Sequence, residues 1–150
     1  MSVNCMPSPH VQSMIWATDQ VGMELLLYPP ANSSVADRFG TAEDAVGFGA
    51  CYEEFTQAIH AEVGATAAIR GAGYNVSALM AVFRDQSYLD ECSRWPFDLW
   101  WDKFYFGTNI HPYETLFVKA NRNVDPVLLE LMTGLHVSGH NEGRSWDLCK

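Results

Sequence analysis

The sequence predicts a mainly α-helical fold, built as one compact domain of about seven short-to-medium helices over residues 1–150. Two observations carry this prediction. Apolar residues recur at intervals of three and four in several stretches, which is the spacing of one helix face. Capping residues and stopping glycines or prolines bracket most of these stretches. The length also suits one domain, because 150 residues with 48% apolar content can bury a single core.

An α+β fold is the alternative. Its small sheet would come from segments near 22–28, 65–70 and 113–119, which are short and include residues typical of strands. In either fold we expect residues 1–8 to form a loose N-terminal arm and residues 135–150 to form a loop-like tail, since the tail contains Gly139 and Gly143.

The first two helices are expected over residues 8–28 and 41–63. Ser8 and Pro9 are typical of a helix start. Thr41 and Asp44 resemble a capping box, and Gly64 is a natural stop. The core-facing stripe of the second helix is predicted to be Phe48, Tyr52, Phe55, Ile59 and Val63.

Further helices follow from capping and stop signals along the second half of the chain. Asp125 precedes Pro126, which indicates a helix start, and Gly134 indicates its end. Residues 112–120 are ambiguous between helix and strand. The remaining predicted helices cover residues 75–83, 87–94, where Trp95-Pro96 ends the helix, and 97–106.

The charge pattern limits the possible partners. Eighteen acids against nine bases give a net charge of −9, and residues 1–69 hold eight acids and one base, Arg38. Clustered Lys and Arg are absent, which argues against direct nucleic-acid binding and against a polybasic membrane contact. No apolar run approaches the ~20 residues of a membrane helix. An acidic surface is typical of proteins that meet a basic protein partner, although it also serves solubility.

The cysteines give no metal or redox motif. Cys5, Cys51, Cys92 and Cys149 lie more than forty residues apart, so no C-x-x-C pair exists. The N-terminus has no basic and apolar leader, which predicts a cytoplasmic protein with reduced thiols. We therefore expect no structural metal and no cofactor.

The aromatic segment 95–106 has two interpretations. Its seven aromatic residues fit a central core helix, but Trp100, Trp101 and Tyr105 could instead anchor a protein partner or a second copy of the chain. Asp98 and Asp102 lie one helical turn apart and are weak candidates for acid–base or metal chemistry.

The C-terminal tail offers a second weak catalytic candidate. His136, His140 and Glu142 are the right residue types for zinc or ferrous iron, but Gly139 argues against a helix that would align the histidines. These residues define the alternative function, a small enzyme that uses a metal.

The function favoured by the sequence is a small acidic interaction protein of the cytoplasm. It would bind, and inhibit or modulate, a protein partner with a basic surface, as immunity proteins and phage-encoded antagonists do by analogy only. The partner-binding residues would be Glu43, Asp44, Glu53 and Glu54, together with Trp100, Trp101 and Tyr105.

Overall fold

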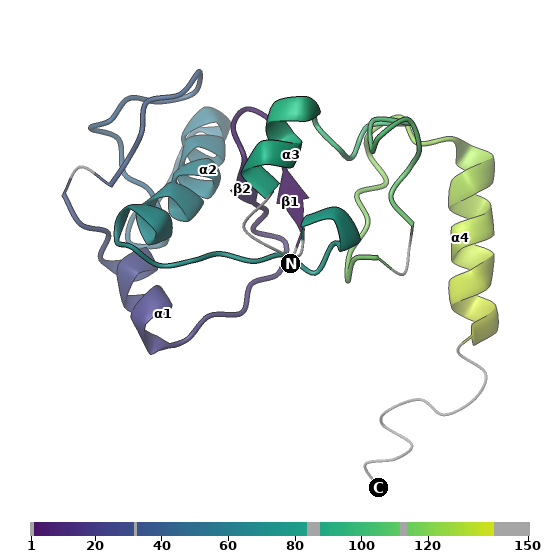
Figure 1. Cartoon of the computed structure of the whole chain (residues 1–150), viewed down its shortest axis with the longest axis horizontal. Helices are drawn as coiled ribbons and strands as arrows, with labels where there is room; N and C mark the ends of the chain where they lie inside the picture. The colour runs from purple at the N-terminus through teal and green to yellow at the C-terminus, as the bar shows by residue number, and fades with distance from the viewer. Residues whose placement is uncertain (1, 32, 84–87, 112–113, 140–150) are drawn as a thin grey trace, which may run out of the picture.

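The computed structural model describes residues 2–31, 33–83, 88–111 and 114–139. This part of the chain contains α-helices, a short 3-10 helix and a two-stranded antiparallel sheet (Figure 1). The elements in chain order are β1 (Val3–Asn4), β2 (His10–Val11), α1 (Gln20–Leu27), α2 (Phe55–Gly71), η1 (Ala81–Phe83), α3 (Tyr88–Arg94) and α4 (Pro126–Gly139).

The seven-helix prediction is wrong, and so is its α+β alternative. Residues 22–28 and 65–70, which the alternative placed in strands, lie mainly in α1 and α2, and the described residues 114–119 contain no strand. The sheet forms instead from β1 and β2, where Val3 pairs with Val11 and Asn4 with His10. Long loops replace helices because tertiary contacts hold the intervening segments in extended or turn conformations.

The helix expected from Ser8 begins only at Gln20. Residue 11 is held in a strand because the Val11 backbone N–H donates to Thr66 Oγ1 on α2, at 2.9 Å. The true helix start is marked by Asp19, whose side chain accepts from the Gly22 backbone N–H at 2.9 Å. Contact with α2 therefore overrides the local start signal at Ser8 and Pro9.

The helix expected over 41–63 begins fourteen residues late, at Phe55, and continues past Gly64 to Gly71. The Thr41–Asp44 contact does form, since Asp44 Oδ2 accepts from the Thr41 backbone N–H at 2.7 Å, but it closes a turn. The loop then binds the end of α1, where the Phe48 N–H donates to Leu26 O at 2.6 Å. Gly47 adopts a φ of 78°, which suits glycine and breaks helical geometry.

The aromatic segment is also not a helix. Lys103 and Phe106 both have positive φ, and Tyr105 pairs with Thr108 in an isolated antiparallel bridge. Residues 97–108 therefore form successive turns, which spread the aromatic side chains over several directions. Of the helix predicted over residues 75–83, only η1 forms, and residues 75–80 are not helical.

The predicted short helix before Trp95 is confirmed as α3. The start of α4 is confirmed as well: Asp125 Oδ1 accepts from the Val127 N–H at 2.8 Å. The predicted stop at Gly134 is wrong, because α4 continues to Gly139. Residues 135–139 are thus helical, and the rest of the predicted tail lies outside the described residues.

Two buried clusters form the core. The first surrounds Leu26 of α1, which packs against Ala65 and Ile69 of α2. The second joins the N-terminal hairpin to the aromatic segment and consists of Val3, Cys5, Val11, Ala78, Met80, Phe83, Cys92, Leu99, Trp100, Tyr105 and Ile110. The N-terminal arm predicted to be loose is therefore part of the core.

A disulfide joins Cys5 to Cys92, across a sequence separation of 87 residues. The expectation of reduced thiols is therefore wrong for this pair, while Cys51 is free and exposed. The bond connects the residue after β1 to α3, so the start of the chain is covalently fixed to its middle.

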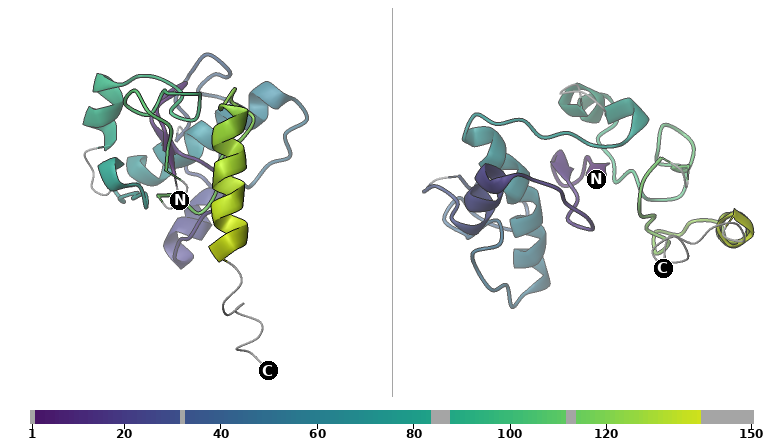
Figure 2. Two further views of the ribbon diagram at one scale, coloured as in Figure 1. Left: turned by 90° about the vertical axis from the view of Figure 1, so that its right-hand side faces the viewer. Right: turned by 90° about the horizontal axis from the view of Figure 1, so that it is seen from below.

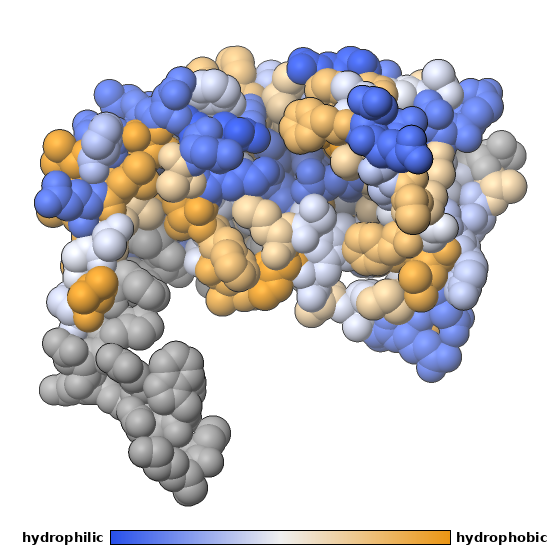
Figure 3. All heavy atoms as spheres, turned by 180° about the vertical axis from the view of Figure 1, so that it is seen from behind, coloured by the Kyte–Doolittle hydropathy of each residue, from blue (hydrophilic) through white to orange (hydrophobic). Residues whose placement is uncertain are grey.

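The molecule is elongated in the view of Figure 1, with α1 and α2 at one end, the hairpin near the middle and α4 at the other end (Figure 1). Two further views show α4 standing beside the turns of the second half with its long axis largely uncovered (Figure 2). The exposed apolar residues of α4 contribute to the apolar surface at this end of the molecule, which lies on the left when the molecule is seen from behind (Figure 3). Among the described residues, no helix has the length and apolar character needed to cross a bilayer.

Replacement of Gly64 by alanine tests the packing on α2. The new Cβ would lie 2.2 Å from Val46 Cγ1, so Val46 must move. We expect Gly64→Ala to lower the free energy of unfolding by about 1–3 kcal/mol, measured by urea denaturation.

Gly134→Ala is the matched control, because Gly134 is a helical glycine with no atom within 4 Å of the built Cβ. Because alanine has a better helix propensity than glycine, this substitution should leave the free energy of unfolding unchanged or raise it by up to ~1 kcal/mol. Equal effects of the two substitutions would show that Val46 does not pack on Gly64.

Candidate functional site

The four acidic residues predicted to face a partner are all exposed. Glu43 and Asp44 lie in the loop before α2, and Glu53 and Glu54 immediately precede its first turn. Hydrogen bonds from Thr41 lower the pKa of Asp44, which keeps this exposed carboxylate charged. The expected exposure of these acids is confirmed, although the loop before α2, and not a helix, presents all four.

The three aromatic residues proposed for binding separate into two groups. Trp100 is 3% exposed and Tyr105 is 7% exposed, so both belong to the core. The Tyr105 hydroxyl donates to Glu114, and burial is the main cause that raises the pKa of this phenol. Trp101 is 39% exposed and remains available at the surface.

Asp98 and Asp102 do not form a catalytic pair on one helix face, because their segment is not helical. Asp98 Oδ1 accepts from the Asn4 side chain and the Trp100 backbone N–H, both at 3.1 Å. Its other oxygen contacts Arg122 Nε at 3.4 Å. Asp98 therefore connects the hairpin to the aromatic segment and serves the structure.

The C-terminal candidates cannot be assembled into a site. The backbone of His136 lies in α4, whereas His140 and Glu142 lie outside the described residues. Among the residues that are described, no group of three or more His, Cys, Asp and Glu side chains is placed to hold a metal ion.

A groove of about 630 Å³ is the candidate ligand site. One wall comes from the start of α2 and the preceding loop, and the other comes from the aromatic turns; the hairpin forms the floor between them. We call it the aromatic groove, and the residues that define it are Phe39, Phe55, Ile59, Phe97, Trp101 and Phe104 on the walls, His10 and Gln12 on the floor, and Arg38, Lys119 and Arg122 as its cations.

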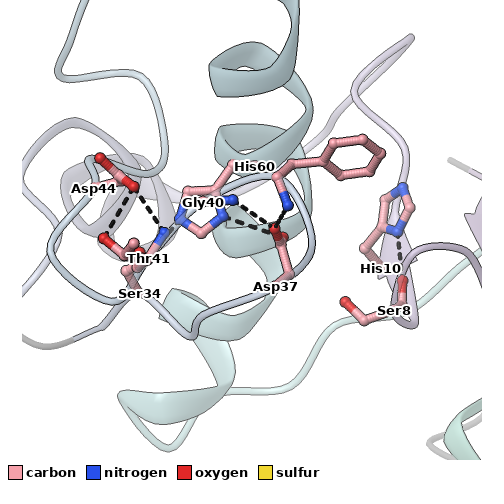
Figure 4. Close-up of polar contacts among 9 residues, drawn as sticks. Ser8, His10, Ser34, Asp37, Gly40, Thr41, Asp44 and His60 are labelled. Atoms are coloured by element: carbon pink, nitrogen blue, oxygen red, sulfur yellow. Dashed lines mark hydrogen bonds and ion pairs between the residues drawn. The ribbon is translucent and has the colours of Figure 1, made fainter.

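The floor of the aromatic groove is polar and almost completely buried. His10 is 2% exposed and Gln12 is 1% exposed. His10 Nδ1 lies 2.7 Å from Ser8 O, which fits a ring that donates from this nitrogen (Figure 4). Burial lowers the pKa of His10, so the ring is neutral at neutral pH and Nε2 is left as an acceptor.

A second polar cluster surrounds His60, which is 1% exposed on α2 (Figure 4). His60 Nε2 lies 2.9 Å from Ser34 Oγ, and His60 Nδ1 lies 3.1 Å from Asp37 Oδ2. The second contact is an ion pair by distance, but its atoms are not aligned as a hydrogen bond. Asp37 Oδ1 accepts from the backbone N–H groups of Phe39 and Gly40, at 2.7 and 3.0 Å.

The order of serine, histidine and aspartate resembles that of a hydrolytic triad. The surroundings favour a structural role. The Ser34 hydroxyl donates to Thr41 O at 3.3 Å, and Gly40 lies so close that a Cβ there would be 2.5 Å from His60 Cγ. Ser34 is 9% exposed and its Oγ contacts both Thr41 O and His60 Nε2, so the cluster fastens residues 34–44 to α2.

Sequence reasoning missed both the aromatic groove and the His60 cluster. Their residues come from distant segments, and no spacing rule connects Ser34 with His60 or Phe55 with Trp101. The one usable signal is that Arg38, the single base in residues 1–69, stands between Asp37 and Phe39.

The buried neutral state of His10 predicts a pH dependence of stability. Its pKa in the folded state lies below the ordinary value of 6.5, so the unfolded chain binds more protons than the folded one as the pH falls below that value. The free energy of unfolding should therefore decrease from about pH 7.5 to about pH 5.5, as measured by urea denaturation. In His10→Gln this slope should become smaller, and an unchanged slope would contradict the assignment.

No protein-family model matches the chain, and no curated protein or solved structure is significantly similar to it. Its function is therefore inferred from its own residues and their geometry.

Proposed function

We propose that the protein is a small acidic interaction protein that binds, and thereby inhibits or modulates, a protein partner with a basic surface. The binding surface is the acidic segment 43–54 together with the exposed side chain of Phe55 that follows it. The partner supplies Lys or Arg to the carboxylates and an apolar pocket to the phenyl ring.

The exposure of Phe55 carries this proposal. The ring is 78% exposed, although it stands at the first position of α2 beside Glu54. A large apolar ring in water next to carboxylates resembles the centre of many interfaces, where an aromatic anchor is surrounded by polar groups. The predicted core role of Phe55 is wrong, and the surface role replaces it.

The charge around Phe55 supports a basic partner. Glu43, Asp44, Glu53 and Glu54 are all exposed, and none forms an ion pair with another described residue. Their field extends over about one Debye length, ~8 Å at physiological salt, and accelerates encounter with an oppositely charged surface. Trp100 and Tyr105 leave the proposed surface because they are buried, while Trp101 stays exposed nearby in the aromatic groove.

Two other expectations stay predictions. The first is a homo-oligomer through the aromatic-rich second half, in which α4 exposes Val127, Leu131 and Leu135. The cytoplasmic location also stays a prediction, and the Cys5–Cys92 disulfide weighs against it, because such bonds persist mainly in oxidising compartments.

Reversal of charge in the acidic segment tests the proposal. The variant Glu43→Lys/Glu53→Lys is chosen because Asp44 is hydrogen-bonded to Thr41 and Glu54 occupies the N-cap of α2. The immobilised chain would first recover its partner from an extract of the source cell at low salt. We expect the variant to lower the association rate with that partner by about tenfold, and to flatten its dependence on salt.

Glu24→Lys/Glu130→Lys is the matched control, because it changes the net charge by the same amount at exposed residues of α1 and α4 that lie outside the acidic segment. It should leave the association rate close to that of the unmodified protein. Equal rates for the two variants, or recovery of no partner at low salt, would overturn the proposal.

A further inference from the structure

The aromatic groove has the size and walls of a small-molecule site. Its volume of about 630 Å³ lies within the range of ~300–1,000 Å³ common for such sites. Phe97 and Phe104 stack with their ring centroids 5.4 Å apart and their planes 11° from parallel. Trp101 adds a third ring on that wall, and Phe39 and Phe55 line the wall on the α2 side. Flat apolar groups fit between such walls because both faces can contact rings.

The number of cations that line the groove is unusually large for such an acidic chain. The protein has nine Lys and Arg residues and a net charge of −9, yet Arg38, Lys119 and Arg122 all line the same groove. Arg38 lies over the Phe39 ring with its guanidinium carbon 4.5 Å from the ring centroid. This contact holds the charge at the groove edge while leaving its N–H donors free to bind a ligand.

Two carboxylates also line the groove, and both are already bound. Asp98 accepts from Asn4 and Trp100 and contacts Arg122. Glu62 Oε1 accepts from the backbone N–H and the hydroxyl of Ser13, at 2.7 and 2.9 Å. In the described part of the chain, neither Arg38 nor Lys119 has an ion-pair partner. These two cations are therefore the groups that a ligand can neutralise.

The floor does not oppose an anion. His10 is buried and neutral, and Gln12 carries no charge. Burial is the main cause that lowers the pKa of His10, and the charges of Glu62, Lys119 and Asp98 also act on it, so these three groups lie near the floor. An anion bound to Lys119 would thus lie over neutral polar groups and close to two carboxylates that already have hydrogen-bond donors.

We propose that the aromatic groove binds a small aromatic carboxylate, with its ring system between the aromatic walls and its carboxylate on Lys119 and Arg38. One negative charge suits the site, since the acidic surface of the protein repels ligands with several. Binding of a nucleic-acid backbone would need a row of cations that this surface lacks. The site shares Phe55 with the surface proposed to bind a protein partner, but none of the carboxylates of the acidic segment lines the groove.

Calorimetric titration with 2-naphthoate and 2-naphthamide tests the proposal, because the two probes share a ring system and differ in charge. We expect 2-naphthoate to bind about tenfold more tightly than 2-naphthamide. If the unmodified protein binds the two probes with comparable affinity, or binds neither, the proposal is overturned.

Substitutions of the two cations locate the site. Arg38→Gln and Lys119→Gln should each weaken 2-naphthoate binding by about fivefold and leave 2-naphthamide binding almost unchanged. Arg94→Gln is the control, because Arg94 is exposed on α3, pairs with Glu91 and does not line the groove. If all three variants bind 2-naphthoate with equal affinity, the carboxylate site lies elsewhere and the proposal fails.

The acidic-segment variant Glu43→Lys/Glu53→Lys separates this proposal from the proposed function. It should keep full affinity for 2-naphthoate, since neither residue lines the groove. Lost naphthoate binding in this variant would show that the acidic segment takes part in ligand binding and would contradict the assignment of the carboxylate to Lys119 and Arg38.

Discussion

The run of small residues Gly64, Ala65 and Thr66 in α2 is the constraint on which the rest of the structure depends. Gly64 lets Val46 approach so closely that no side chain fits between them. One residue later, Ala65 contacts Leu26 of α1, and Thr66 accepts the backbone N–H of Val11. Three distant segments therefore meet at three consecutive residues, which make up less than one turn of the helix. Bulky residues at these positions would hold all three segments away from the helix and from one another.

The aromatic groove is a consequence of this arrangement. Its α2 wall carries Phe55 and Ile59, which lie about two and a half turns and about one and a half turns before Gly64. The segment that forms the opposite wall contributes its neighbouring residues Leu99, Trp100 and Tyr105 to the second core cluster, and Asp98 joins it to the hairpin through Asn4. The hairpin thus determines the width of the groove, because each of its two neighbours is fixed to it independently.

Sequence reasoning succeeded where a signal acts on its own neighbours. Asp125 caps α4 with its own side chain, so the start of that helix could be read directly from the sequence. The prediction of a helix over residues 41–63 failed because apolar residues spaced three and four apart do not show what a segment packs against. Phe55 fits the stripe and yet faces water. The His60 cluster needed Ser34 and Asp37 from a loop, and only the folded chain brings these groups together.

The Cys5–Cys92 disulfide connects two parts of the chain that are 87 residues apart in the sequence, so the molecule stays covalently joined even where the backbone between them is cut. The loop from Tyr28 to Glu54 lies inside the ring that this bond closes, and much of it is exposed. A protease that cuts this loop would produce two fragments that still migrate as one species until a reductant is added. Cleavage there leaves the hairpin joined through α3 to the fragment that carries α2 and the aromatic turns, so the Phe55–Ile59 wall, the floor and the Phe97–Phe104 wall stay in one covalent unit.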